Sequence, residues 1–386
     1  MPKLSPDPAH LQRTAEAMAL MFDEGVPAVL RGVGTLFEVA EVFAWIKRAH
    51  PPARANTAHD KIVAVKRSWG LSPDDPHPPG CEPGRPAEIY RGGGLVLDAS
   101  PFLPADTHDT FDHWVHDASD RLGGEFCMQA PGLECAGWDA LERLQTLLHP
   151  VLALTGPRTY RYNAFVGDYR RTPFGFHLDP HQEAVFQYVL QGRRRGLFWE
   201  GLTLTHDDAA WVEDTNGLTT PHREPEVVLE LEPGDLVFWP GTHLHGFEAE
   251  GPSMGLSMVI DRISPRSRED VVAGLHCATM GGKAALPMVA DRTVLTEDDV
   301  IECRGPFSLA YERFDDALIV AVCGRTFDWP DPASIAEAIG LLDLLRERKS
   351  ERLPLRTLVQ TCANENLSSE DICEVMTMLA NLGLVR

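Results

Sequence analysis

The sequence has little that would place the chain in a membrane, outside the cell or around a cysteine-bound metal. No uninterrupted apolar run approaches the length of about 18 residues that a transmembrane helix needs. The N-terminus, Met1-Pro2-Lys3-Leu4-Ser5, lacks the apolar core of a signal peptide. The eight cysteines include no Cys-X-X-Cys pair, which excludes zinc-finger spacing and gives no disulfide framework. We therefore expect a cytoplasmic protein with reduced thiols and no membrane partner.

Basic residues are also scarce. The chain has 35 Lys and Arg against 57 Asp and Glu, a formal net charge of -22. A field of that sign repels nucleic acid and anionic membranes, so we do not expect nucleic acid as a partner. A basic polypeptide would suit this charge as a substrate or partner, although acidity that serves only solubility explains it equally simply.

The 386 residues are enough for more than one domain, and 32 glycines and 30 prolines favour many turns and short strands. Apolar spacing predicts helices at 9–23, 37–48, 107–122, 138–153, 334–348, 355–364 and 368–383. A capping box, Ser368-Ser369-Glu370-Asp371, opens the last of these. Short strands separated by turn residues are predicted at 25–32, 158–263 and 306–328, and a proline-rich loop at 72–86. The fold class we expect is therefore mainly β with helices (α+β), built on a sandwich or barrel.

One short segment carries the first half of a metal site. His177-Leu178-Asp179 lies in the strand-rich stretch. Side chains alternate along a strand, so His177 and Asp179 point to the same side, roughly 7 Å apart along the chain. An imidazole nitrogen and a carboxylate oxygen can then converge on one ion. Because His-X-Asp is a weak motif alone, the prediction needs a third ligand.

A second segment supplies that ligand. Pro233-Gly234-Asp235 makes a tight turn, an apolar strand follows, and a second turn leads to His243 and His245. Two histidines and one carboxylate on one face of a metal leave open positions, which is typical of non-haem iron(II) oxygenases. His243 and His245 compete for the third place, since they are two residues apart. His181 with His177 would instead favour zinc and a hydrolase, whereas His206 and His222 are expected to be structural.

Several segments together resemble the JmjC-type (cupin) Fe(II)- and 2-oxoglutarate-dependent oxygenases, and most of all the ribosomal oxygenases: His177-Leu178-Asp179, Val185-Phe186, Gln191-Gly192-Arg193-Arg194-Arg195, Glu232-Pro233-Gly234-Asp235 and His245. The resemblance implies that His177, Asp179 and His245, rather than His243, bind Fe(II). The sequence departs from the family in having two extra residues between Asp179 and Val185, and Gly196 where a tryptophan is usual.

The same resemblance assigns 2-oxoglutarate to Arg194, the middle of three arginines. A carboxylate inside a barrel needs a cation, and a guanidinium can donate two parallel hydrogen bonds to it. In a strand, Arg193 and Arg195 would face away from Arg194, so one arginine points inward between two solvated neighbours. Tyr162 and Asn163, on the strand before the triad, are further candidates for contact with the cosubstrate, with packing as the alternative.

The resemblance also implies an architecture. We expect a JmjC/cupin-like catalytic domain over 1–265, with a double-stranded β-helix (jelly roll) at about 158–262. A linker with helix and strands at 266–330, which could support a homodimer, and a winged-helix-like module at 331–386 would follow. The expected function is hydroxylation of a residue in a protein or peptide. The alternatives are an oxygenase that tailors a small molecule or natural-product peptide, favoured by the unplaced stretch 50–150, and a non-catalytic cupin that binds a partner.

Overall fold

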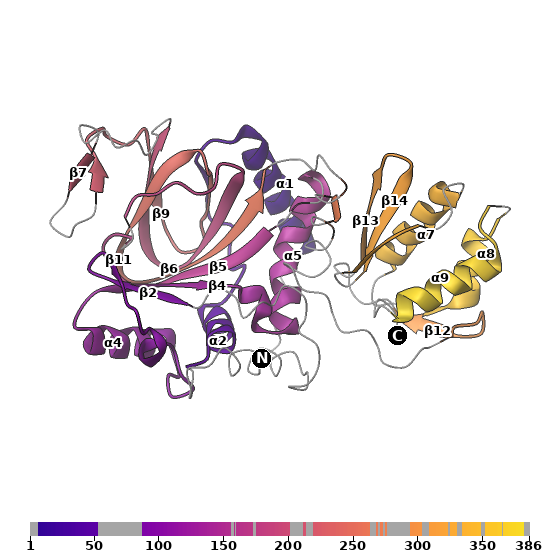
Figure 1. Ribbon diagram of the computed structural model, residues 1–386, viewed down its shortest axis with the longest axis horizontal. Coiled ribbons are helices and arrows are strands. Elements are labelled where there is room, and N and C mark those ends of the chain that lie inside the picture. The colour runs from indigo at the N-terminus through magenta and orange to yellow at the C-terminus, as the bar shows by residue number, and fades with distance from the viewer. Residues whose placement is uncertain are drawn as a thin grey trace. The chain divides into compact units, whose positions relative to one another are not determined.

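The computed structural model describes residues 7–52, 87–155, 158, 160–172, 175–200, 211–213, 219–262, 268, 271–272, 275, 294–302, 309–322, 325–329, 334–348, 352–364 and 366–381. These residues form a mixed α+β structure (Figure 1). The chain divides into two compact units, of which the first holds Arg161–Ile263 with most of the chain before it, and the second holds Ser264–Arg386. Within the described ranges, no helix is long and apolar enough to cross a membrane.

The first unit combines helices with a large sheet. Its helices are α1 (Pro8–Glu24), α2 (Val39–Ala49), α4 (Phe111–Leu122) and α5 (Trp138–Thr155), with short 3-10 turns η1 (Ser100–Phe102) and η2 (Leu133–Ala136). Its strands are β1 (Ala28–Leu30), β2 (Glu88–Arg91), β3 (Gly94–Leu95), β4 (Phe126–Pro131), β5 (Tyr160–Asp168), β6 (Glu183–Glu200), β7 (Trp211–Glu213), β8 (Thr219–Pro221), β9 (Val227–Leu231), β10 (Leu236–Pro240) and β11 (His243–Asp261). The four helices predicted from apolar spacing before residue 155 are thus confirmed, with ends shifted by a few residues.

Nine strands form one sheet in the order β1-β10-β6-β11-β5-β4-β2-β3, and β9 also pairs with β6. Strand β6 is long enough for two neighbours in succession, because β10 pairs with residues 184–188 and β9 with residues 194–198. Strand β11 is antiparallel to β6 along both halves. The chain turns between the halves at Gly192, whose φ of 79° favours glycine. A Cβ there would also meet the Pro252 carbonyl oxygen at 2.8 Å.

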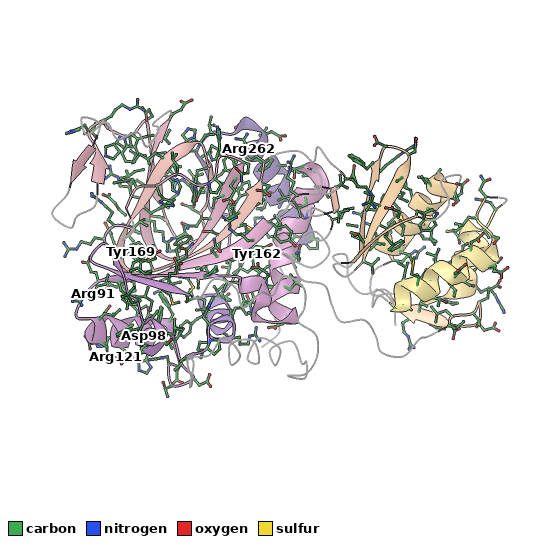
Figure 2. All side chains as sticks on the ribbon, in the orientation of Figure 1. Arg91, Asp98, Arg121, Tyr162, Tyr169 and Arg262 are labelled. Atoms are coloured by element: carbon green, nitrogen blue, oxygen red, sulfur yellow. The ribbon has the colours of Figure 1, made fainter. Side chains whose placement is uncertain are left out.

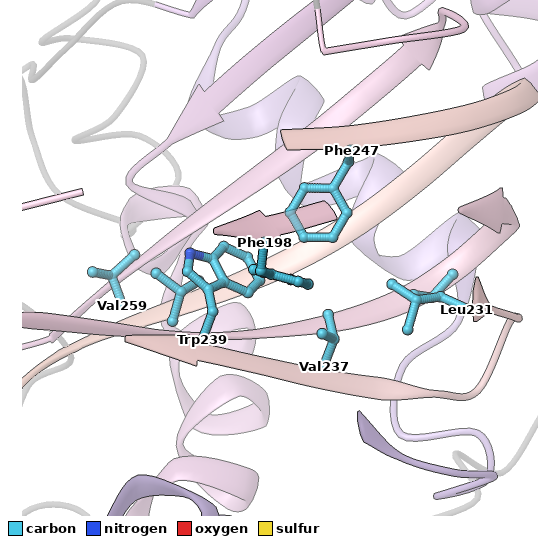
Figure 3. Packing of buried hydrophobic residues seen from close by; sticks show 8 residues of the cluster. Phe198, Leu231, Val237, Trp239, Phe247 and Val259 are labelled. Carbon is cyan, nitrogen blue, oxygen red and sulfur yellow. The ribbon is translucent and has the colours of Figure 1, made fainter. Parts of the chain in front are cut away.

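The bend lets both halves of β6 share one apolar core. Val185 and Val189 from the first half lie in the same buried cluster as Phe198 from the second (Figure 3). The cluster is completed by side chains of β9, β10 and β11: Leu231, Val237, Trp239, Phe247 and Val259. We call this the inner cluster. The candidate site lies beside it, because His245 of β11 packs against Phe198, Trp239 and Phe247 of this cluster.

The opposite face of β6 packs against the segment before α2. The Tyr188 hydroxyl donates to the carbonyl of Gly34 at 2.7 Å and accepts from the amide of Leu36 at 3.2 Å. Its ring lies edge-on to Phe37. Alternation along β6 therefore separates an inner face from a face that contacts the segment before α2.

The second unit has its own strands and helices: β12 (Val300–Glu302), β13 (Leu309–Phe314), β14 (Ala317–Val322), β15 (Arg325–Asp328), α7 (Ile335–Glu347), β16 (Arg352–Pro354), α8 (Leu355–Cys362) and α9 (Ser369–Asn381). The three predicted helices are confirmed. So is the capping box, since the Ser368 amide donates to the Asp371 carboxylate at 2.9 Å and the Asp371 amide donates back to Ser368 Oγ at 3.2 Å. Strands β13, β14 and β15 form a small antiparallel sheet, and β12 pairs with β16.

Strands β2, β3 and β4 were not predicted. They extend the large sheet beyond β5, with β4 antiparallel to β5 from Phe126 to Pro131. Strand β4 is buried on both faces over most of its length, so it carries no alternation of apolar and polar residues from which a strand could be inferred. The predicted loop at 72–86 lies outside the described residues.

Candidate metal centre

Two segments far apart in the sequence meet at the candidate site. The amide of His177 donates to the carbonyl of His245 at 3.0 Å, and the amide of His245 donates back at 3.0 Å. This isolated antiparallel bridge makes the two histidines direct cross-strand partners, whose side chains lie on one side. Their ring centroids are 4.3 Å apart.

Asp179 reaches the same point from the turn after His177. Its Oδ1 lies 3.9 Å from Nε2 of His177, and its Oδ2 lies 3.6 Å from Nε2 of His245. One donor atom from each residue lies within 4.8 Å of the other two, close enough to share a metal ion. The His177 side chain is 33% exposed while that of His245 is 2% exposed, so the group is open on one side.

A glycine holds the Asp179 turn against the strands. The amide of Gly241, between β10 and β11, donates to the carbonyl of Glu183 at 2.7 Å. A Cβ on Gly241 would collide with the carbonyl oxygen of Pro180, the residue after Asp179. Only a residue without a side chain therefore lets this turn approach the end of β10.

Hydrogen bonds fix the ring orientation of both histidines. Nδ1 of His245 lies 3.1 Å from the carbonyl of His243, and Nδ1 of His177 lies 3.4 Å from the carbonyl of Gly175. A carbonyl can only accept, so each Nδ1 carries the proton and each Nε2 presents its lone pair to the shared point. That tautomer is the one a metal requires here.

The charges of the three groups also suit a cation. Burial lowers the pKa of His177, and burial with the nearby His177 lowers the pKa of His245 to about 4. Burial alone would raise the pKa of Asp179, but His245, His177 and the Trp239 N–H outweigh it and hold that pKa below its usual value. Near neutral pH the group is two neutral imidazoles and one carboxylate, ready to bind a metal without losing protons.

The other described histidines considered from the sequence, His181, His222 and His243, are not part of this group. Nδ1 of His243 is 3.2 Å from the Thr242 hydroxyl, and its electrostatic neighbours include Glu200 and Glu226. His181 and His222 are exposed, and His206 lies outside the described residues. In the described part of the chain, only His177, Asp179 and His245 come together as a candidate metal group.

Arg194 is buried on the inner face of β6 and is only 2% exposed. Its guanidinium donates to Oε1 of Gln187 at 3.0 Å, to the carbonyl of Phe165 at 3.0 Å and to the hydroxyl of Ser253 at 3.2 Å. Its Nε has no partner. No carboxylate among the described residues forms an ion pair with it, so within this part of the chain its positive charge is buried without a counter-ion.

The flanking arginines face away, as alternation predicted. The Arg193 side chain is 70% exposed and pairs with Glu232 at 3.2 Å. Arg195 is half-exposed and pairs with Glu230 and Glu248, each at 3.2 Å. The contrast with Arg194 therefore follows from strand geometry.

Comparison with solved structures finds proteins of similar fold. The chain is similar to a ribosomal oxygenase. A crystal structure of the Escherichia coli ribosomal oxygenase YcfD shares 14% identity over 93% of this chain and 94% of that chain, with a TM-score of 0.46. Its complex with cobalt and succinic acid shares 15% identity over 93% of this chain and 94% of that chain, with a TM-score of 0.47. Its complex with cobalt and 2-oxoglutarate shares 17% identity over 68% of this chain and 78% of that chain, with a TM-score of 0.40. No family model and no curated protein matches the sequence.

The two candidates on β5 lie on opposite faces. Tyr162 points to α5, where its hydroxyl donates to the carbonyl of Leu144 at 3.1 Å (Figure 2). Burial raises its pKa well above the usual value. Asn163 is 5% exposed, and its Oδ1 is buried without a hydrogen-bond partner. The structure therefore gives Tyr162 a packing role and leaves Asn163 as the candidate for ligand contact.

Sequence reasoning missed three polar neighbours of these groups. Gln187 and Ser253 hold the Arg194 guanidinium, and Trp239 donates its indole N–H to Oδ2 of Asp179 at 3.0 Å. Alternation from Val185 on β6 could have placed Gln187 on the inner face. The other two depend on pairings between strands that the sequence does not specify.

The residues present fit a divalent metal with an anionic cosubstrate. Two Nε2 lone pairs and a carboxylate oxygen converge within 4.8 Å, which is the donor set that non-haem iron uses. A buried guanidinium with an unsatisfied Nε–H and no carboxylate partner among the described residues fits an anion from outside them.

Proposed function

We propose that this chain is a non-haem Fe(II)- and 2-oxoglutarate-dependent oxygenase. One observation carries the proposal: a two-histidine, one-carboxylate group occurs in the same unit as a buried arginine for which the described residues provide no counter-ion. A metal group alone would also suit zinc, and a buried arginine alone would suit any anion. Together they suit a cosubstrate that binds a metal at one end and needs a cation at the other.

In this proposal His177, Asp179 and His245 hold the metal, and Arg194 binds the distal carboxylate of 2-oxoglutarate. Bound iron with this cosubstrate supplies the oxidising power for C–H hydroxylation, with dioxygen as oxidant and succinate and carbon dioxide as coproducts. Gln187 and Ser253 hold the guanidinium in place, and the unsatisfied amide oxygen of Asn163 can accept a hydrogen bond from a water beside the cosubstrate. The inner cluster excludes water from the buried side of His245.

The architecture belongs to the same proposal. Strands β5, β6, β9, β10 and β11 would form the double-stranded β-helix of a JmjC/cupin-like domain over 1–265. The stretch 266–330 would link it to a winged-helix-like module at 331–386 and support a homodimer. The bend of β6 at Gly192 and the shared inner cluster support the β-helix. Helices α7, α8 and α9 with the β12–β16 pair support the winged-helix module.

The proposed substrate is an amino-acid residue in a protein or peptide, and a basic polypeptide suits best. The net charge of -22 favours encounter with a positively charged partner. Neither a membrane nor nucleic acid is part of the proposal, and the proposed location is the cytoplasm.

Succinate formation tests the proposal. The purified protein with Fe(II), 2-oxoglutarate and air should form succinate, and His177→Ala and Asp179→Ala should not. Mass spectrometry should then find the gain of one oxygen atom on a ribosomal protein or another basic polypeptide. If only a small peptide or metabolite gains the oxygen atom, the alternative of an oxygenase that tailors a small molecule or natural-product peptide would be favoured. Activity with zinc and no cosubstrate would establish a hydrolase, and absence of any turnover with intact partner binding would favour the binding module.

A further inference from the structure

Trp239 connects two of the three candidate ligands. Its indole N–H donates to Oδ2 of Asp179 at 3.0 Å, and its ring centroid lies 5.0 Å from that of His245. Within the described ranges, this N–H is the one hydrogen-bond donor to Asp179. Arg161, the nearby cation, directs two hydrogen bonds to Glu183 at 2.5 and 2.7 Å and acts on Asp179 only through its charge.

The indole is held firmly enough to fix what it touches. Trp239 is 3% exposed and pairs with Val185 in the register of β10 and β6. Its ring packs against Phe247 at 5.1 Å and Phe198 at 6.1 Å between centroids (Figure 3). A close-packed bicyclic ring cannot turn without displacing these neighbours. The direction of its N–H is therefore set by the inner cluster.

A fixed donor on one oxygen limits how Asp179 can bind a metal. A carboxylate can bind through one oxygen, or rotate about its Cβ–Cγ bond and bind through both. The second mode would occupy one of the open positions that a cosubstrate needs. Because the hydrogen bond to Oδ2 resists that rotation, it favours one-oxygen coordination.

On the basis of the proposed function, we propose that Trp239 is the positioning residue of the metal centre, whose N–H holds the Asp179 carboxylate in the orientation that leaves coordination positions open. Hydrogen bonds to metal-binding carboxylates are worth about 10- to 100-fold in metal affinity. The N–H of Trp239 should account for a loss in that range.

The test removes the N–H and keeps the ring. Site-specific replacement of Trp239 with 3-benzothienylalanine exchanges the N–H for sulfur at nearly unchanged volume, and Trp239→Phe is the simpler companion. Trp199→Phe is the matched control, because Trp199 is 2% exposed and donates its N–H to the Arg223 carbonyl at 2.6 Å rather than to a candidate ligand. Each protein is titrated with Co(II) alone by calorimetry, and its visible d–d absorption is recorded. Circular dichroism verifies the fold.

We expect both changes at position 239 to raise the Co(II) dissociation constant by about 10-fold or more and to alter the d–d bands, while Trp199→Phe keeps both. Wild-type affinity and bands in the benzothienyl protein would overturn the inference, even if wild-type succinate formation supports the proposed function. An equal loss in Trp199→Phe would also overturn it, because general damage to the core would then explain the effect. Failure of the wild-type protein to bind Co(II) would overturn the proposed function and this inference with it.

Discussion

Arg194→Met separates the binding of the cosubstrate from the binding of the metal. The guanidinium is 2% exposed, makes three hydrogen bonds and pairs with no carboxylate among the described residues. Truncating one partner of a buried, hydrogen-bonded charge pair costs about 2–5 kcal/mol of affinity. That is roughly a 30- to 4,000-fold rise in the dissociation constant of 2-oxoglutarate. Metal affinity should change little.

The same reasoning predicts an unusual effect on stability. Methionine loses three hydrogen bonds of about 0.5–1.5 kcal/mol each, but it also removes an uncompensated buried charge that costs several kcal/mol. The variant without cosubstrate should therefore unfold at a urea concentration close to that of the wild type. Wild-type protein at a 2-oxoglutarate concentration of 100 times Kd should gain about 2.7 kcal/mol, and Arg194→Met should gain less than about 1 kcal/mol at that concentration.

Calorimetric titration of 2-oxoglutarate into the Co(II)-loaded protein, without oxygen, measures the affinity. Arg193→Met is the matched control, since its exposed guanidinium pairs with Glu232 on the other face. A double-mutant cycle is completed with 2-oxobutyrate, which lacks the distal carboxylate. This ligand should bind the wild-type protein and Arg194→Met with equal affinity. Wild-type affinity for 2-oxoglutarate in Arg194→Met would refute the reasoning. A collapse in stability before any ligand is added would instead make Arg194 a structural residue.

Three further predictions concern the metal group and its support. His245→Ala should abolish Co(II) binding in a calorimetric titration and His243→Ala should retain it, and equal losses would contradict the choice of His245 as ligand. Gly241→Ala should weaken Co(II) binding and lower the urea midpoint, because its Cβ would collide with the Pro180 carbonyl, so wild-type values would exclude this packing role. Burial raises the pKa of Glu134 from 4.5 to about 7, so its contribution to stability is lost as pH rises through that range. Glu134→Gln should therefore be more stable than the wild type at pH 8 but not near pH 4.5, and a pH-independent difference in urea midpoint would contradict this assignment.

The sequence predicted those parts of the site that depend on strand alternation. His177 and Asp179, two residues apart, do converge, and Arg194 is buried between exposed Arg193 and Arg195. The burial of Arg194 between two exposed neighbours needs only the local rule that neighbouring side chains in a strand face opposite sides. Asp179 instead lies in the turn after the isolated bridge at His177, so its convergence with His177 depends on that turn and not on strand alternation. The choice of His245 over His243 came from the resemblance, and the backbone bridge between His177 and His245 now gives it a physical reason.

The parts that sequence reasoning could not reach depend on pairing between distant strands. Tyr162 and Asn163 are adjacent, so alternation alone excludes both from facing one pocket, but only the packing of Tyr162 on α5 shows which faces inward. In the sequence, Trp239 is one more apolar residue of a predicted strand. The turn that brings Asp179 to its N–H could not be predicted from the sequence. Strand β4 was missed because a strand buried on both faces has no period of two.

The balance of buried charge joins the two halves of the site. A divalent metal contributes two positive charges and Arg194 a third, while Asp179 contributes one negative charge. Arg161 and Glu183 cancel each other in a two-hydrogen-bond pair. With such a metal bound as proposed, the site would carry two positive charges that the described residues do not compensate, which a low-dielectric environment disfavours strongly. A dicarboxylate cosubstrate supplies two negative charges, whereas a water or a monocarboxylate leaves at least one positive charge unbalanced. Neutrality therefore favours a dianion over other anions, for a reason independent of any resemblance to known oxygenases.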